Sequence, residues 1–273
     1  MQRSRRTIDM QTSQRIQLFG LPFDALAFQS AVDAIVQAVR DRNDDNKGLV
    51  ITPNVDLIVT ADRRPDVHEV FRSARFLFAD GMPVVWTSRL IPGKSLPARV
   101  SGPDLLAALC ERAASSGLRV AFVGGMPGVA ARASEAMRKK HPALQVVGVH
   151  CPPFGFEHDA RQTQDIIDLC NAGKPDILFL GVGSPKQEIW SHANLARLDV
   201  GMVLCIGAAL DFAAGTLRRA PRWMQRAGFE WFWRMTQDPK RLIKRYLLRD
   251  AAFFPIALRE ILSGRLPKQG RDR

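Results

Sequence analysis

Polar residues of the kinds that bind ligands follow directly after several short apolar runs of this 273-residue chain. Thr, Asn, Gln and Asp side chains suit the hydroxyl groups of a sugar, and glycine lets the backbone approach a phosphate at a helix N-terminus. One such junction is usually only a turn, but five along one chain indicate a ligand site. The five junctions are 52–54 (TPN), 80–81 (DG), 124–125 (GG), 181–188 (GVGSPKQE) and 207–211 (GAALD).

The segments between these junctions predict an α/β fold. Apolar runs of four to seven residues alternate with segments such as 29–40, whose apolar residues recur at helical spacing. This alternation is typical of a Rossmann-like parallel sheet with helices on both faces. Ligands of such sheets bind beyond the carboxyl ends of the strands, so the junctions are expected to share one edge. The predicted strands are 47–52, 76–79, 119–123, 144–149, 176–180 and 200–206, and the predicted helices are 29–40, 55–61, 105–114, 129–140, 160–171 and 185–197.

Motifs for common cofactors, nucleophiles and metals are missing. The segment 124–128 (GGMPG) is not the G-x-G-x-x-G of dinucleotide-binding proteins, and neither a P-loop nor a G-x-S-x-G elbow occurs. The five His and four Cys residues show no metal-ligand spacing, and there is no Asp-x-Asp. The sequence therefore predicts neither a bound cofactor nor a metal site.

Charge divides the chain into unequal parts. The net charge is +12, and residues 218–273 carry 15 Lys and Arg against 5 Asp and Glu, a net charge of +10. A basic segment implies an anionic partner. We therefore predict a polar disordered segment over 1–15, an α/β domain over 16–217 and a basic helical appendage over 218–273. No apolar run is long enough to span a bilayer, and 1–15 lacks the apolar stretch of a secretory signal.

Five segments together resemble the WecG/TagA/CpsF family of bacterial glycosyltransferases. They are 52–56 (TPNVD), 78–86 (FADGMPVVW), 96–106 (LPARVSGPDLL), 180–190 (LGVGSPKQEIW) and 207–221 (GAALDFAAGTLRRAP). The resemblance runs from about residue 18 to 246. It implies transfer of a sugar from a UDP-sugar to an acceptor linked to polyprenyl diphosphate, at the inner face of the cell membrane. Members of this family build cell-surface polysaccharides without the metal-binding Asp-x-Asp, which agrees with its absence here.

The resemblance also implies roles for individual residues. Asp80 matches the family's proposed catalytic base, which would take the proton of the attacking hydroxyl. Its structural alternative is the N-cap of a helix starting near Pro83. Thr52 and Asn54 match residues that line the donor sugar pocket, although Asn54 could simply cap the helix that follows it. The remaining substrate-binding candidates are Arg99 near the diphosphate or the acceptor, Gly124, Gln187 and Asp211, the last beside the nucleoside.

The basic appendage acquires a role from the same resemblance, because the family's C-terminal segment is thought to dock on the membrane and bring arginines to the acceptor diphosphate. Arg219, Arg226 and Arg234 are the candidates here. Residues 240–249 place basic side chains on one arc of a helix and apolar side chains on the other. Trp223, Trp231 and Trp233 stand among the upstream arginines. Aromatic and basic residues together suit an anionic lipid surface. The alternative is an ordinary packed helix pair with a tryptophan core.

Other classes of function stay open at this point. Basic residues interleaved with aromatic ones also serve nucleic-acid binding, so a non-catalytic nucleic-acid-binding module is one alternative. The row of polar junctions in the nearly neutral body argues against it. An NAD-dependent or sugar-nucleotide-dependent enzyme of the same fold is another alternative, although it lacks a fingerprint. We expect a cytoplasmic protein, peripheral on the inner membrane face, with partners limited to donor, acceptor and anionic membrane. A homo-oligomer is left open.

Overall fold

Apolar runs of the chain form a six-stranded parallel sheet in the order β4-β3-β8-β7-β5-β6. The computed structural model describes residues 14–42, 47–237, 239 and 249–265. A separate antiparallel hairpin of β1 and β2 precedes the sheet. The strands are β1 (Arg15–Leu18), β2 (Leu21–Asp24), β3 (Gly48–Ile51), β4 (Phe76–Leu77), β5 (Arg119–Gly124), β6 (Gln145–His150), β7 (Ile177–Gly181) and β8 (Met202–Cys205).

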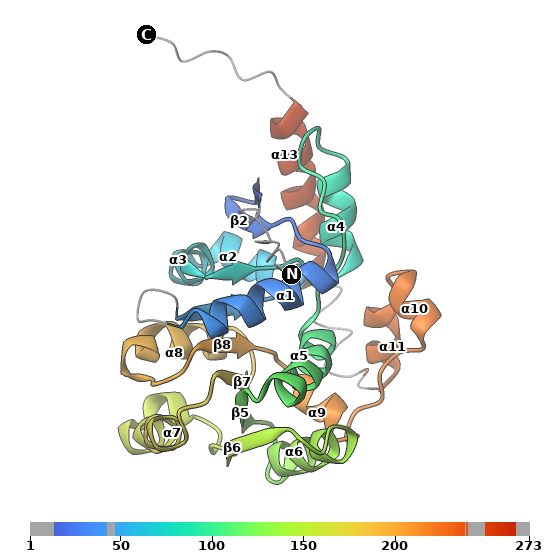
Figure 1. The fold of residues 1–273 in the computed structure, drawn as a ribbon. Helices are drawn as coiled ribbons and strands as arrows, with labels where there is room; N and C mark the ends of the chain where they lie inside the picture. Colours follow the sequence, from blue (N-terminus) through green and yellow to red (C-terminus); the bar gives the residue numbers. More distant parts are fainter. Residues whose placement is uncertain (1–13, 43–46, 238, 240–248, 266–273) are drawn as a thin grey trace, which may run out of the picture.

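Helices cover both faces of this sheet, so the predicted Rossmann-like α/β fold is confirmed (Figure 1). All six predicted strands and the six predicted helices are present, with ends shifted by a few residues. The helices of the described residues are α1 (Phe28–Arg40), α2 (Val55–Arg63), α3 (Pro65–Ser73), α4 (Met82–Arg89), α5 (Gly102–Ser116), α6 (Val129–Lys140), α7 (Ala160–Gly173), α8 (Lys186–Asn194), α9 (Ala209–Ala213), α10 (Arg222–Arg226), α11 (Glu230–Gln237) and α13 (Phe253–Arg265).

Alternation along each strand divides the core into two layers. In β7, Ile177 and Phe179 pack with α1, α5 and α6, while Leu178 and Leu180 pack with α2, α3, α7 and α8 on the other face. Successive strand side chains point to opposite faces, so a strand with helices on both sides is apolar throughout. All five residues of β7 are accordingly buried. The edge strand β6, by contrast, is only partly buried.

The last helix, α13, belongs to the second of these layers. Phe253, Ile256 and Ala257 are buried in the same cluster as α2 and α3. Two ion pairs reinforce this packing, Lys94 with Glu260 at 2.9 Å and Arg259 with Asp62. Figure 1 shows α13 lying alongside α4, away from α10 and α11. The chain thus returns to the body after α11, and the division at residue 217 stays a prediction.

Candidate active site

A cavity of about 900 Å³ lies at the carboxyl ends of four neighbouring strands. Thr52 and Asn54 enter it after β3, Asp80 after β4, Gln187 after β7 and the turn at residue 207 after β8. The carboxyl ends of parallel strands meet at one edge, which is where open α/β sheets bind ligands. A volume of this order is usual for small-molecule sites. Four of the five polar junctions are therefore brought together, as predicted from their positions in the sequence.

Asp80 lines this cavity, and its carboxylate makes no hydrogen bond or ion pair with the described residues. Helix α4 begins at Met82 with Gly81 as its N-cap, and no side chain caps it. The Asp80 backbone N–H donates to the Pro53 carbonyl at 3.0 Å, which ties the junction after β4 to the one after β3. Within the described part of the chain its carboxylate has neither a hydrogen-bond partner nor an ion pair. Asp80 is therefore not the helix cap that the sequence offered as its alternative.

The electrostatic surroundings of Asp80 favour proton transfer near neutral pH. Burial raises the pKa of the Asp80 carboxyl to about 7, the nearby guanidiniums of Arg99 and Arg234 oppose this rise, and the carboxylates of Glu230 and Asp104 add to it. A general base works best when its pKa lies near the operating pH. The position, freedom and pKa of Asp80 together fit a group that takes a proton from a bound hydroxyl.

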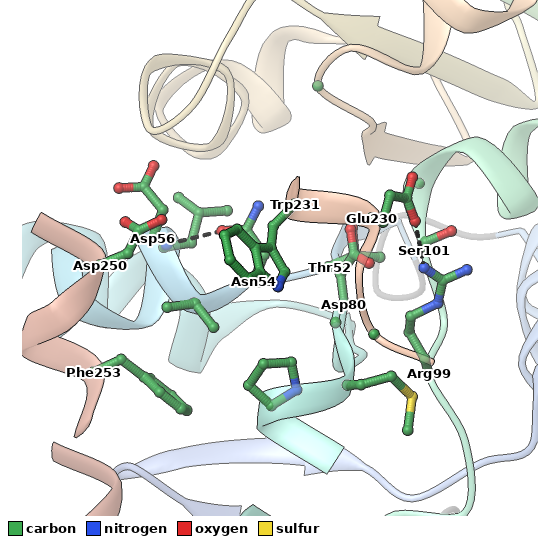
Figure 2. Close-up of a pocket in the computed structure, with 18 of the residues that line it drawn as sticks. Thr52, Asn54, Asp56, Asp80, Arg99, Ser101, Glu230, Trp231, Asp250 and Phe253 are labelled. Atoms are coloured by element: carbon green, nitrogen blue, oxygen red, sulfur yellow. Dashed lines mark hydrogen bonds and ion pairs between the residues drawn. The ribbon is translucent and has the colours of Figure 1, made fainter. Parts of the chain in front are cut away.

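Two arginines and two carboxylates form a network beside Asp80. Arg99 bonds to Glu230 at 2.7 Å and to Asp104 at 3.1 Å, and Figure 2 shows Arg99 reaching Glu230 next to Asp80. Arg219 bonds to both oxygens of Asp104 at 2.5 and 2.8 Å and pairs with Glu230 at 3.5 Å. Although burial alone would raise the pKa of Asp104, hydrogen bonds from Arg219 and Ser101 lower it. The network joins the α10–α11 segment to the body, and its four charges sum to zero.

We expect Glu230→Gln to move the pH dependence of activity. The Glu230 carboxylate raises the pKa of Asp80, so removing its charge should lower that pKa. Because a base acts when deprotonated, activity should rise with pH through this pKa, and the variant's rise should begin at a lower pH. The measurement is the pH profile of kcat/KM, which reports the free enzyme.

Glu188→Gln is the control for that profile, because burial also raises the pKa of Glu188 to about 7. The acidic limb of its profile, which is the rise of kcat/KM with pH, should stay at the same pH as in the unmodified protein. A profile that lost its limb in Glu188→Gln and kept it in Glu230→Gln would assign the titration to Glu188 instead.

Gln187 and Glu188 form a buried polar cluster at the cavity wall, each 1% exposed. The Gln187 amide donates to Glu188 at 2.7 Å and to Ser184 at 3.0 Å, and its oxygen accepts the Gly207 N–H at 3.2 Å. Gln187 thus links the junction after β7 to the one after β8. Because the Gln187 amide group donates to Glu188 and Ser184 and accepts from Gly207, Gln187 fixes the positions of these residues in the cavity wall. Glu188 was not singled out from the sequence, although the 185–188 run (PKQE) contained it.

The other predicted residues differ in whether they line the cavity. Asn54 lines the cavity and also caps α2, accepting the Leu57 N–H at 3.1 Å, so both of its predicted roles are compatible. Gly124 and Asp211 are not among the lining residues. Gly124 packs against the Gly181 backbone too closely for a side chain, and Asp211 accepts hydrogen bonds from Thr216. The ligand-binding roles of Gly124 and Asp211 stay predictions.

The three arginines predicted for the acceptor diphosphate also separate. Arg234 lines the cavity and lies over the Phe212 ring at 5.7 Å. Arg219 bonds to Asp104, as Arg99 does, but is not a lining residue of the cavity. The Arg226 side chain and residues 240–248 lie outside the described part of the chain. Among the predicted arginines whose side chains are described, Arg99 and Arg234 line the cavity and Arg219 does not.

The tryptophans of the appendage do not form a core. Trp223 is 65% exposed, and no residue of α11 is buried. None of the described helices is long and apolar enough to cross a membrane. In the same described part of the chain, no group of three or more His, Cys, Asp or Glu side chains is placed to hold a metal ion.

Fold and cavity define a Rossmann-like α/β protein whose candidate ligand site lies at the carboxyl edge of its sheet and contains the Asp80 carboxylate. Comparison with known proteins gives the family. The family model described as "Glycosyl transferase WecG/TagA/CpsF family" matches residues 16–267, so the chain belongs to this family of glycosyltransferases. A relative from Bacillus spizizenii (strain W23) is 32% identical over 199 residues, covering 72% of this chain and 75% of the relative. That relative is named N-acetylglucosaminyldiphosphoundecaprenol N-acetyl-beta-D-mannosaminyltransferase.

Proposed function

We propose that this glycosyltransferase moves a sugar from a UDP-sugar to an acceptor linked to polyprenyl diphosphate, in the synthesis of a cell-surface polysaccharide. The observation that carries the proposal is the Asp80 carboxylate beside Arg99 in the cavity. It has a raised pKa and makes no hydrogen bond or ion pair within the described residues. The name of the Bacillus relative, which specifies a diphosphoundecaprenol-linked acceptor, supports the acceptor class.

In the proposed mechanism Asp80 acts as general base. An acceptor hydroxyl attacks the anomeric carbon of the donor sugar, and its proton passes to the Asp80 carboxylate. The bond from that carbon to the diphosphate oxygen breaks, and UDP leaves with the electron pair. Arg99 and Arg234 face the cavity and would stabilise the negative charge that develops on the diphosphate. For Arg99 to do so, the diphosphate must take the place of Glu230 beside it.

Binding measurements separate this function from the alternatives. We expect UDP to bind and to protect the protein against thermal unfolding, because a ligand that binds only the folded state stabilises it. NAD should give no such protection. Protection by NAD and none by UDP would favour the NAD-dependent alternative and contradict the proposed donor.

We further propose that the reaction needs no metal ion, with arginines taking the place of a cation at the diphosphate. Transfer should then continue in excess EDTA at an unchanged rate. Measuring turnover in EDTA, then after adding Mg²⁺ or Mn²⁺, checks this. Loss of turnover that either metal restores would show that carboxylates outside the proposed set bind a metal.

We place the protein on the inner face of the cell membrane, with an anionic lipid surface as a partner. Support comes from the net charge of +10 in residues 218–273 and from exposed aromatic residues such as Trp223 and Phe232. Each basic residue near an anionic leaflet contributes about 1 kcal/mol. Binding to anionic vesicles that survives nuclease treatment would distinguish this from nucleic-acid binding.

A further inference from the structure

We infer that the groove between α4 and α13 is a binding site for the isoprenoid chain of the acceptor, a subsite distinct from the polar end that holds sugar and diphosphate. This inference rests on the proposed function, because that function supplies an acceptor with a charged head and a hydrocarbon chain.

Both helices present the same stripe of positions to one cavity. On the α4 side, the lining residues are the first two of the helix and those four, five and eight positions after the first. On α13, the residues at the same five positions line the cavity. This spacing places all five residues on one face of a helix. The lining residues are Met82, Pro83, Trp86, Thr87 and Leu90 on the α4 side, and Phe253, Phe254, Ala257, Leu258 and Ile261 on α13.

These stripes leave large apolar side chains open to solvent. Trp86 is 46% exposed, Phe254 75% and Leu258 57%. Six of the thirteen large exposed apolar residues among the described residues line this one cavity. Large apolar patches rimmed by polar residues mark binding surfaces, because exposing them to water is unfavourable. A ligand that covers this patch must itself be apolar.

The groove is continuous with the catalytic end of the cavity. Helix α4 begins two residues after Asp80, and its stripe extends from there for about 12 Å at the rise of an α-helix. Figure 2 shows Asp80, Arg99 and Glu230 on one side of the cavity and Phe253 on the other. Asp56 and Asp250 also lie on the Phe253 side, where Asp56 pairs with Arg249 at 2.9 Å. The cavity therefore has a charged end, suited to the diphosphate of the acceptor, and an apolar wall next to it, suited to the hydrocarbon chain that follows the diphosphate.

Contacts at both ends of α4 define the groove. Near the start of the helix, Gly228 packs so closely against Trp86 that a side chain there would not fit. Beyond the far end of α4, Gly264 of α13 packs still more closely against Ile91. The two helices thus meet beyond the groove, and the groove opens toward Asp80. An isoprenoid chain that lies here has its diphosphate at the end of the groove nearer Asp80, within the same cavity.

Direct binding of small probes tests this inference without any need for turnover. Farnesyl diphosphate carries an isoprenoid chain, whereas inorganic diphosphate has none, and calorimetry measures both affinities on the full chain. We expect farnesyl diphosphate to bind at least about tenfold more tightly, since a few buried methylene groups supply that difference. Equal affinities would overturn the inference.

Leu258→Ala and Leu262→Ala form a matched pair for the same measurement. Leu258 and Leu262 lie four positions apart on α13 and are 57% and 56% exposed, but only Leu258 lines the cavity. Leu258→Ala should lose most of the preference for farnesyl diphosphate and keep its affinity for inorganic diphosphate, while Leu262→Ala should keep both. An equal loss in the two variants would make the stripe a general apolar surface, such as a membrane contact.

Kinetics separate failure of this inference from failure of the proposed function. With acceptors that share one head group, KM should fall as isoprene units are added, and Leu258→Ala should weaken that trend with little change in kcat. Transfer with no dependence on chain length would reject the groove and leave the function standing. Chain-dependent binding of farnesyl diphosphate with no transfer from any sugar nucleotide would retain the groove and reject the function.

Discussion

Asp80→Asn should lower turnover by about 10²–10⁴ while UDP binding stays within a few-fold of that of the unmodified protein. The amide has nearly the shape of the carboxylate but cannot take the proton of the attacking hydroxyl. Because the Asp80 carboxylate makes no hydrogen bond or ion pair in the described structure and does not cap α4, the change should leave the fold intact. Single-turnover rates and UDP affinity, measured on the same preparation, give both quantities.

Asp66→Asn is the control for that substitution. Asp66 pairs with Arg64 on the surface at 2.5 Å, and its side chain is 57% exposed, so turnover should be unaffected. Because exposed ion pairs contribute little to the free energy of unfolding, loss of this pair should also leave the protein folded. If Asp80→Asn retained turnover within a few-fold, Asp80 would not be the base and the mechanism would need another proton acceptor.

Arg99→Ala should reduce turnover by about 10²–10³, the cost usually seen when one preorganised group facing a developing negative charge is lost. Affinity for UDP should fall as well, because Arg99 faces the cavity where the diphosphate is expected. The same change removes a positive charge that lowers the pKa of Asp80, so the acidic limb of the pH profile should move to higher pH. This shift is opposite in direction to the one expected for Glu230→Gln.

Arg99→Lys distinguishes charge from geometry. Arg99 spans Glu230 and Asp104 with two nitrogens, which a single ammonium group does not reproduce. We expect Arg99→Lys to restore the position of the acidic limb but only part of the rate. Full activity in Arg99→Ala would show that Arg99 serves only the ion-pair network and not the reaction.

Much of the fold could be predicted because its signals are local. Each buried strand is a short apolar run, and the polar residues after these runs marked the edge where Thr52, Asn54 and Asp80 now line one cavity. The hairpin of β1 and β2 was not among the predicted elements. Both strands have only four residues, and Pro22 within the second weakens the strand signal. The turn between the strands places Phe19 and Gly20 at positive φ values of 56° and 73°, and of these two residues only Gly20 is typical of such a turn.

The parts of the site that depend on contacts distant in sequence could not be predicted. Glu230 pairs with Arg99, 131 residues away, and Asp104 with Arg219, 115 residues away. Neither spacing carries a pattern, and each carboxylate read alone is an ordinary surface residue or part of a helix. The apolar stripe of α13 had a helical period, but only its packing beside α4 turns it into a cavity wall.

Product analysis tests the central claim most directly. The full chain is incubated with UDP-N-acetylmannosamine and, in parallel, with a panel of other UDP-sugars, each with a short-chain polyprenyl diphosphate acceptor that carries N-acetylglucosamine. The mass of the lipid product is then measured. We expect one donor to add a single sugar residue to the acceptor and release UDP, with Asp80→Asn forming almost no product. A folded, UDP-binding protein that adds no sugar from any of these donors, or that only hydrolyses the donor, would contradict the account.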